Sequence, residues 1–225
     1  MKIDRDGVPF IVASAAPAVL AAARGHRRIA VALAVLPVAV GAFFRDPDRQ
    51  PEQRPSADEH LVLAPADGKV MHVGDPQPDV APPGDWQQIS IFLSLADVHI
   101  NRTPVGGTLR AVSHRPGRYL AAFKAESAHL NERSELTVGT VVDGVERTVV
   151  FRQIVGMAAR RVVTRVRAGD ELVAGQRIGL MRFGSRMDVF VPLDAQIEVA
   201  VGDKTVAGES VIARWPSADL LEQGS

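Results

Sequence analysis

The dipeptide Gly184-Ser185, in the stretch MRFGSRMD, combines a nucleophile with an unusually accessible carbonyl group. A serine hydroxyl is a weak nucleophile until a base accepts its proton and hydrogen-bond donors stabilise the oxyanion that forms. The preceding glycine has no Cβ, so its carbonyl is open to attack and its backbone tolerates strain. Alone, however, Gly-Ser is more typical of a turn between strands, so its surroundings decide its meaning.

Two further residues could assist such a serine. His99, in the segment VHINRTP, has a side chain whose unperturbed pKa lies near neutrality, which suits proton transfer. Asp67, in PADGKV, has a carboxylate that could orient an imidazole and stabilise its charged form. Each also has a structural interpretation, because a lone histidine after a strand is often a core residue and Asp-Gly favours a hairpin turn.

Arg102 and Arg133 are the candidate anion-binding residues, since guanidinium forks match the geometry of phosphodiester and carboxylate groups. The alternative for Arg133 is the charged, solvent-facing end of a helix. The chain has no cysteine, which excludes disulfides and thiolate nucleophiles, and its six histidines form no ligand pair, so no metal site is expected. The formal net charge is zero, which gives no reason to expect nucleic-acid binding.

Several segments together resemble one known family. Residues 168–192, AGDELVAGQRIGLMRFGSRMDVFVP, resemble the self-cleaving region of the short bacterial (type A) phosphatidylserine decarboxylases, which are pyruvoyl-dependent proenzymes. Shorter matches are FLSLADVHINRTP, PADG, AFKAESAHLNER and RQIVG. Longer family members carry two histidines where this chain has His99 and Arg102. Phe-Gly-Ser-Arg, in place of the Leu-Gly-Ser-Thr of many members, matches a shorter subgroup.

The resemblance implies that the chain makes its own cofactor. Ser185 would attack the carbonyl of Gly184 and convert the peptide bond into an ester. Elimination and hydrolysis would then separate an α and a β chain and leave a covalent pyruvoyl group derived from Ser185. In the family, the aspartate and the histidine that correspond to Asp67 and His99 assist such steps.

The resemblance also implies a reaction, the conversion of phosphatidylserine to phosphatidylethanolamine. The substrate amine would form a Schiff base with the pyruvoyl group, which withdraws electrons from the bond to the departing carboxylate. Arg102, Arg133 and Gln153 would bind the substrate, and no metal is implied.

The first 49 residues differ in character from the rest. Two apolar runs, residues 8–23 and 29–44, are separated by the basic connector RGHRR. A cleaved signal peptide or a buried soluble helical pair would fit less well than a membrane-associated helical hairpin, because the chain start is mixed in charge and both runs lack charges. The basic connector favours contact with anionic lipid at the cytoplasmic face of the cell membrane.

Residues 50–60 form a polar, proline-containing linker, and residues 61–225 form the predicted decarboxylase domain. Its short alternating runs predict strands, among them 61–63, 88–93 and 137–142, and one helix is expected over 119–131. The predicted fold class is mainly β, an antiparallel sandwich or barrel-like domain with few helices, plus the N-terminal apolar hairpin.

The residues leave two other functions open. The first is a membrane-tethered, non-enzymatic β-sandwich carrier or adaptor of the biotinyl or lipoyl type, although none of the four lysines lies in the hairpin-tip motif that such carriers modify. The second is a pyruvoyl decarboxylase of a free amino acid, which the apolar N-terminal region disfavours. The expected partners are phosphatidylserine, an anionic membrane surface and the two cleaved chains; a homo-oligomer stays open.

Overall fold

The computed structural model describes residues 2–49, 60–157, 161–182 and 185–216. The chain divides into two compact units, Met1–Asp48 and Arg49–Ser225, which are described separately. The predicted linker at 50–60 falls almost wholly outside the described residues and therefore stays a prediction.

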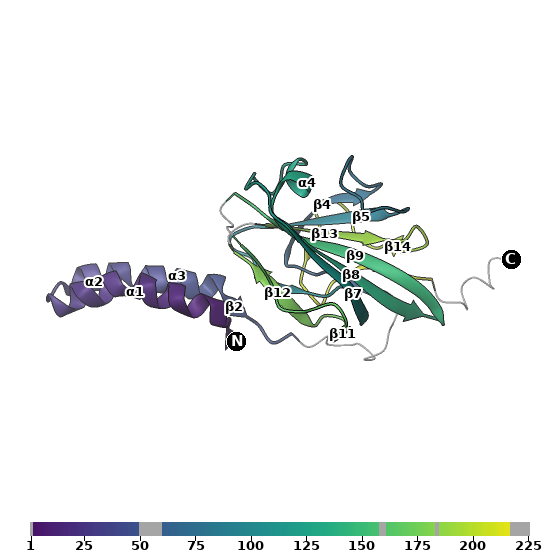
Figure 1. The fold of residues 1–225 in the computed structure, drawn as a ribbon. Coiled ribbons are helices and arrows are strands. Elements are labelled where there is room, and N and C mark those ends of the chain that lie inside the picture. Colours follow the sequence, from purple (N-terminus) through teal and green to yellow (C-terminus); the bar gives the residue numbers. More distant parts are fainter. Residues whose placement is uncertain (1, 50–59, 158–160, 183–184, 217–225) are drawn as a thin grey trace. The chain divides into compact units, whose positions relative to one another are not determined.

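The N-terminal unit is a helical hairpin closed by a short pair of strands (Figure 1). Helix α1 packs along α2 and α3, and Gly25 has φ +82°, a left-handed conformation that glycine adopts without steric cost where the chain reverses. The expected apolar hairpin is thus confirmed. The elements are β1 (Lys2–Ile3), η1 (Arg5–Gly7), α1 (Val8–Ala23), α2 (Arg27–Leu33), α3 (Val35–Phe43) and β2 (Arg45–Asp46).

The helices of this hairpin direct many large apolar side chains outward. Val12, Val31 and Val38 are 66%, 73% and 70% exposed. Within the described ranges, one helical segment, Arg5–Ala23, is long and apolar enough to cross a membrane by length and composition. Such a segment permits membrane association.

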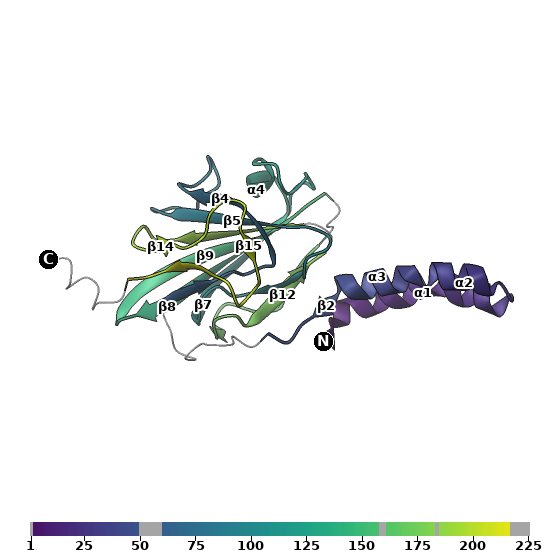
Figure 2. The same ribbon diagram turned by 180° about the vertical axis from the view of Figure 1, so that it is seen from behind.

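The second unit is built on a curled, antiparallel eight-stranded sheet of half-barrel form (Figures 1 and 2). Its strand order is β11-β7-β8-β9-β13-β5-β4-β15, and two three-stranded sheets, β10-β12-β6 and β14-β16-β3, complete the unit. The strands are β3 (Leu61–Leu63), β4 (Gly68–Gly74), β5 (Gln87–Leu93), β6 (Ile100–Arg102), β7 (Gly107–Arg115), β8 (Arg133–Val142), β9 (Val145–Val155), β10 (Val162–Thr164), β11 (Glu171–Leu172), β12 (Arg177–Met181), β13 (Ser185–Val191), β14 (Gln196–Ile197), β15 (Lys204–Thr205) and β16 (Val211–Arg214).

Alternation along the central strands separates a core face from an outer face. On β13, Met187, Val189 and Val191 belong to the main hydrophobic core, whereas Phe190 belongs to a smaller cluster on the other side. Successive side chains of a strand point to opposite faces, which is why this period-two pattern gives a sheet with two covered sides. The mainly β prediction is confirmed.

The helix expected over 119–131 is wrong except for its last turn, α4 (Ser127–Leu130). The side chain of Asn131 explains the difference. It accepts a hydrogen bond from the backbone N–H of Leu120 at 2.9 Å and donates to the backbone oxygen of Leu120 at 2.9 Å. These bonds satisfy backbone groups that a helix would otherwise pair along the chain, so the segment closes as a loop.

Candidate active site

Ser185 is the first residue of β13, the strand that lies between β9 and β5. It is paired with Val155 on one side and with Leu93 on the other, and its side chain is fully buried. Alternation along β13 puts it on the same face as Met187, toward the core. Among the described residues, nothing forms a hydrogen bond with its Oγ. Gly184 lies outside the described residues.

His99 lies beside the segment that leads into Ser185. Its backbone oxygen accepts a hydrogen bond at 3.2 Å from the N–H of Met181, the last residue of β12. The ring is 2% exposed, and its Nδ1 lies 3.0 Å from the backbone oxygen of Asp97. A carbonyl oxygen only accepts, so in the neutral ring Nδ1 carries the hydrogen and Nε2 keeps a lone pair.

Gln153 is a diagonal neighbour of Ser185 across the β9–β13 pair, because it lies opposite Met187. Its Nε2 donates to Oδ1 of Asn101 at 2.9 Å, and its Oε1 accepts from the hydroxyl of Thr164 at 2.8 Å. Gln153 therefore links the large sheet to the sheet β10-β12-β6, whose strand β6 begins directly after His99. Asn101 and Thr164 were not singled out from the sequence, because nothing in the order of residues pairs them with Gln153.

Asn101 is fully buried, and within the described part of the chain its Nδ2 has no hydrogen-bond partner. The hydrogen bond from Gln153 fixes the position of Asn101 Oδ1, so the two N–H groups of the Asn101 side chain point away from Gln153. The site thus contains two buried polar atoms, Asn101 Nδ2 and Ser185 Oγ, without a bonded partner among the described residues. Buried polar groups are usually paired, and such exceptions often mark places where chemistry occurs.

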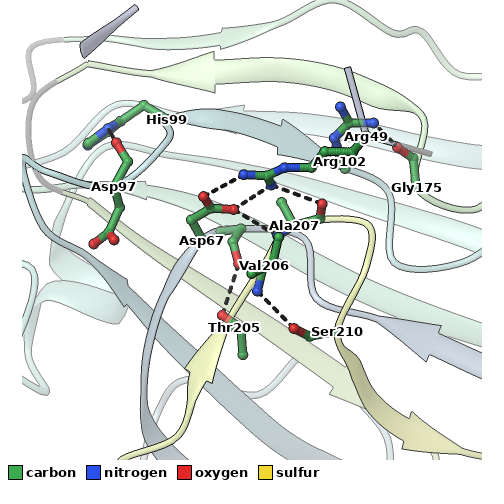
Figure 3. Close-up of polar contacts among 11 residues, drawn as sticks. Arg49, Asp67, Asp97, His99, Arg102, Gly175, Thr205, Val206, Ala207 and Ser210 are labelled. Atoms are coloured by element: carbon green, nitrogen blue, oxygen red, sulfur yellow. Dashed lines mark hydrogen bonds and ion pairs between the residues drawn. The ribbon is translucent and has the colours of Figure 1, made fainter. Parts of the chain in front are cut away.

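Asp67 is held by Arg49 and by a backbone amide (Figure 3). The guanidinium of Arg49 reaches both carboxylate oxygens, at 2.5 and 2.6 Å, and the N–H of Ala207 donates to Oδ1 at 2.8 Å. Asp67 directly precedes β4, which lies two strand positions from β13, so the two backbones are about 10 Å apart. An intervening imidazole would be needed to connect Asp67 with Ser185, whereas Nδ1 of His99 lies beside the backbone oxygen of Asp97. A joint action of Asp67, His99 and Ser185 in cleavage stays a prediction.

Arg49 was not predicted as a site residue. The sequence places it at the end of the RDPDR segment, where it fits an exit from the hairpin equally well. Its pairing with Asp67 depends on tertiary structure, since the two residues are 18 positions apart in the chain. No local signal in the sequence could have identified it.

Arg102 is buried, and its Nη1 donates to the backbone oxygen of Gly175 at 2.8 Å (Figure 3). A Cβ added to Gly208 would lie 2.8 Å from Cδ of Arg102, so the side chain passes tightly beside that glycine. By alternation along β6, Arg102 points away from the face that carries Asn101. The structure therefore does not bring Arg102 together with Gln153, and its substrate role stays a prediction.

Arg133 begins β8, and its Nη1 donates to the backbone oxygen of His129 at 2.6 Å. Burial lowers the pKa of its guanidinium, the neighbouring charges of Arg152 and Arg115 lower it further, and Glu135 opposes them. Arginine nevertheless stays protonated in proteins. Arg133 lies opposite Ile154, which in turn lies opposite Arg186, so the strand register puts Arg133 on the face of the sheet away from Ser185. The structure therefore does not bring Arg133 together with Ser185, and its substrate role stays a prediction.

The described residues near the start of β13 offer hydroxyl and imidazole chemistry. The described ranges hold no cluster of three or more His, Asp or Glu side chains that could bind a metal ion. By contrast, Ser185 offers a buried hydroxyl on a central strand, and His99 offers a base held beside the residues that precede that serine. This arrangement can perform proton transfer and nucleophilic attack in a site screened from water.

Comparisons with known proteins identify the family to which the chain is similar. The family model described as phosphatidylserine decarboxylase matches residues 38–213. A phosphatidylserine decarboxylase proenzyme of Symbiobacterium thermophilum is 44% identical, with 95% of this chain and 96% of that protein covered. The proenzymes of Solibacter usitatus and Mycolicibacterium smegmatis are each 40% identical, with 95% and 92% of this chain and 97% and 87% of those proteins covered.

Proposed function

Because this chain belongs to the phosphatidylserine decarboxylase family, we propose that it is a proenzyme that cleaves itself between Gly184 and Ser185 and then converts phosphatidylserine to phosphatidylethanolamine. The observation that carries the proposal is the fully buried Ser185 hydroxyl without a hydrogen-bond partner among the described residues. Leaving such a group unpaired costs about 1–3 kcal/mol, so a reactive role is a physical reason to keep it there.

In the proposed maturation, Nε2 of His99 accepts the hydroxyl proton of Ser185 while Oγ adds to the carbonyl carbon of Gly184. The peptide bond between the carbonyl carbon of Gly184 and the nitrogen of Ser185 then breaks, and the proton passes to that nitrogen. Gly184 is now joined to Oγ of Ser185 by an ester bond. Loss of the Ser185 α-proton expels the Gly184 carboxylate, and water replaces the nitrogen, which departs as ammonia. The hydrogen bond between His99 Nδ1 and the Asp97 oxygen supports the required orientation of the ring.

The mature site would rest on a pyruvoyl group formed from Ser185. Its electrophilic carbonyl supplies an acceptor for the substrate amine and for the electrons of the bond to the carboxylate. The chain's own contribution would be binding and proton transfer. Arg133, at the end of the sheet where β13 begins, would attract the anionic headgroup, and Gln153 with Asn101 would fix polar groups beside the reacting position. His99 would hold or return a proton there.

The two chains of the mature enzyme would remain associated. The short chain begins with β13, which lies between β5 and β9 in the middle of the large sheet and is buried along its whole length. The exposed basic residues Arg24, Arg27 and Arg28 support placement of the hairpin against anionic lipid at the cytoplasmic face of the cell membrane.

Intact mass and a denaturing gel test the proposal. The wild-type chain should separate into a fragment ending at Gly184 and a fragment that begins at position 185, lacks a free amine and reacts with carbonyl reagents. Ser185→Ala should remain full length and inactive, whereas Ser90→Ala, a change at another fully buried serine on the neighbouring strand, should still be cleaved. A wild-type chain that is active without cleavage would overturn the proposal.

A further inference from the structure

Among the exposed large apolar side chains of the second unit, four lie on loops near the end of the sheet where β13 begins. Leu95 is 61% exposed, Tyr119 45%, Phe123 63% and Met157 73%. We refer to these four residues as the apolar rim. Exposed apolar side chains are ordinary when scattered, but a contiguous group indicates a surface that contacts something less polar than water.

The strand register brings two rim residues to the same edge of the sheet. Strands β5 and β9 flank β13 and both run toward its first residue, since Leu93 and Val155 are the partners of Ser185. Leu95 and Met157 follow those partners by two residues each. Because β5 and β9 are two strand spacings apart, Leu95 and Met157 leave the sheet about 10 Å from each other, on either side of Ser185.

The loop before α4 reaches the same edge. The ring of Phe123 lies 6.3 Å from that of Phe92, the residue next to Leu93, in an edge-to-face arrangement. The hydroxyl of Tyr119 donates to Glu132 at 2.9 Å, and the backbone oxygen of Glu132 accepts from the N–H of Val155 at 3.1 Å. A cavity of about 290 Å³ extends the apolar surface from Phe123 along β4 and β5; it is lined by Lys69, Val70, Met71, Phe92, Phe123 and Val201.

The charges at this edge are predominantly basic. Four exposed cations, Arg115, Arg118, Lys124 and Arg161, lie on the same loops or at the strand ends beside them. The acidic residues there are Asp97, Glu126 and Glu132, of which Glu126 is exposed and the other two are half-buried. The half-buried acids are engaged locally, Asp97 by Ser94 and Glu132 by Tyr119.

The opposite end of the sheet offers a contrast within the same unit. Val141, Val145 and Leu193 are exposed there, at 55%, 54% and 61%. Their neighbours Asp143, Glu146 and Asp194 are exposed and acidic, and Arg147 pairs with Asp194 at 3.0 Å. Apolar exposure therefore coincides with an excess of cations at the Ser185 end. At the far end the three acidic residues are paired with basic groups, Asp143 with His60, Glu146 with Arg110 and Asp194 with Arg147.

We propose that the apolar rim is a second membrane-contacting surface, separate from the N-terminal hairpin, that inserts into the headgroup region of an anionic bilayer at the end of the sheet where Ser185 begins β13. A surface that combines exposed apolar side chains with neighbouring cations is of the kind that binds an anionic membrane interface. The biological sense of this contact rests on the proposed lipid substrate, but the contact itself does not require turnover. It would let a two-chain lipid reach the site without leaving the bilayer.

The chain has no native cysteine, so a single introduced cysteine can be labelled at one known position in the full-length protein. Single variants Leu95→Cys, Phe123→Cys and Met157→Cys would carry the environment-sensitive fluorophore NBD. They are mixed with vesicles of phosphatidylglycerol and phosphatidylcholine, an anionic membrane that contains no substrate. We expect a several-fold rise in NBD emission at these positions and its quenching by lipids with a doxyl group near the headgroup. Val145→Cys and Leu193→Cys are the matched exposed controls and should not respond.

Two results would overturn the proposal. The first is bound protein whose rim probes respond no more than the Val145 and Leu193 probes, because the hairpin alone would then make the contact. The second is a rim signal that appears without vesicles and grows with protein concentration, because a second copy or another protein surface would then cover the rim. Repeating the measurement in Ser185→Ala separates the two hypotheses: rim quenching there, in an uncleaved chain, supports membrane contact whatever the fate of the maturation proposal.

Discussion

The imidazole of His99 is held by a backbone carbonyl, because Nδ1 lies 3.0 Å from the oxygen of Asp97. That bond leaves Nε2 as the acceptor needed by a general base. Since losing a general base typically costs a factor of about a hundred to ten thousand, His99→Ala should slow cleavage by that factor and accumulate uncleaved precursor. A time course of precursor loss measures it.

The matched control is His72→Ala, since the His72 ring also contacts a backbone oxygen, that of Asp75 at 2.7 Å, but in an outer strand and loop. His72→Ala should mature at the wild-type rate. If His99→Ala does so too, His99 is not the cleavage base and its role is confined to decarboxylation or structure.

Asp67 forms a largely buried ion pair with Arg49, with side chains 14% and 10% exposed. Asp67→Asn removes one charge and leaves the other unpaired, so we expect a loss of roughly 2–4 kcal/mol in the free energy of unfolding together with slower cleavage. Urea unfolding of the uncleaved Ser185→Ala background measures the first effect, and precursor loss in the otherwise wild-type chain measures the second.

Arg49→Gln distinguishes a chemical role of Asp67 from a structural one. Both variants break the same pair, but only Asp67→Asn removes the carboxylate. Cleavage that is slower in Asp67→Asn than in Arg49→Gln at equal stability would support a chemical role of the Asp67 carboxylate. Equal rates would mean that Asp67 acts only through Arg49.

At the scale of elements, the position of β13 governs what cleavage does to the fold. After cleavage this strand would belong to the short chain, yet its ladders to β5 and β9 and its burial do not depend on the broken bond. We expect the two fragments to elute together in size-exclusion chromatography and to separate only in denaturant. Separation under native conditions would show that the strand is not held as the register indicates.

The segment 119–131 illustrates how one side chain overrides a helical pattern. Asn131 bonds both backbone groups of Leu120 and also donates to the backbone oxygen of Val155 at 2.7 Å. The last of these bonds joins the segment to Val155, which ends β9 and is the strand partner of Ser185. The loop that results carries Tyr119 and Phe123 to the rim, which a continuous helix would not.

At the scale of the whole molecule, the two units predict a separable division of labour. Removing residues 1–44 should give a more soluble protein that still cleaves itself, because Arg49, Asp67, His99 and Ser185 all remain. Activity on dispersed short-chain lipid should survive better than activity on vesicles, because the apolar hairpin would no longer concentrate the enzyme at the bilayer. Sedimentation with vesicles and parallel activity assays measure both effects.

The control for this comparison is Ser185→Ala in the same shortened chain, which should remain uncleaved. A shortened protein that fails to fold even in detergent would show that the hairpin belongs to the core of the catalytic unit. A further deletion through Arg49 should be less stable than the first, since it removes the partner of Asp67.

The sequence determined the mainly β class, the apolar hairpin and most strand positions, because period-two alternation and uncharged apolar runs are local properties. Residues 61–63 coincide with β3, and residues 88–93 lie within β5. The sequence also directed attention to Ser185, His99 and Gln153 through motifs whose members are close together along the chain.

Only the tertiary structure decided which of these residues meet. The contacts between Gln153 and Asn101, between Arg49 and Asp67, and between Met181 and His99 join residues far apart in sequence. No periodicity records such pairs, because they depend on strand order and register in three dimensions. The same strand order brings the guanidinium of Arg102 to the backbone oxygen of Gly175. It also brings the apolar rim to the end of the sheet where Ser185 lies. Both contacts follow from which strands are neighbours rather than from any local pattern.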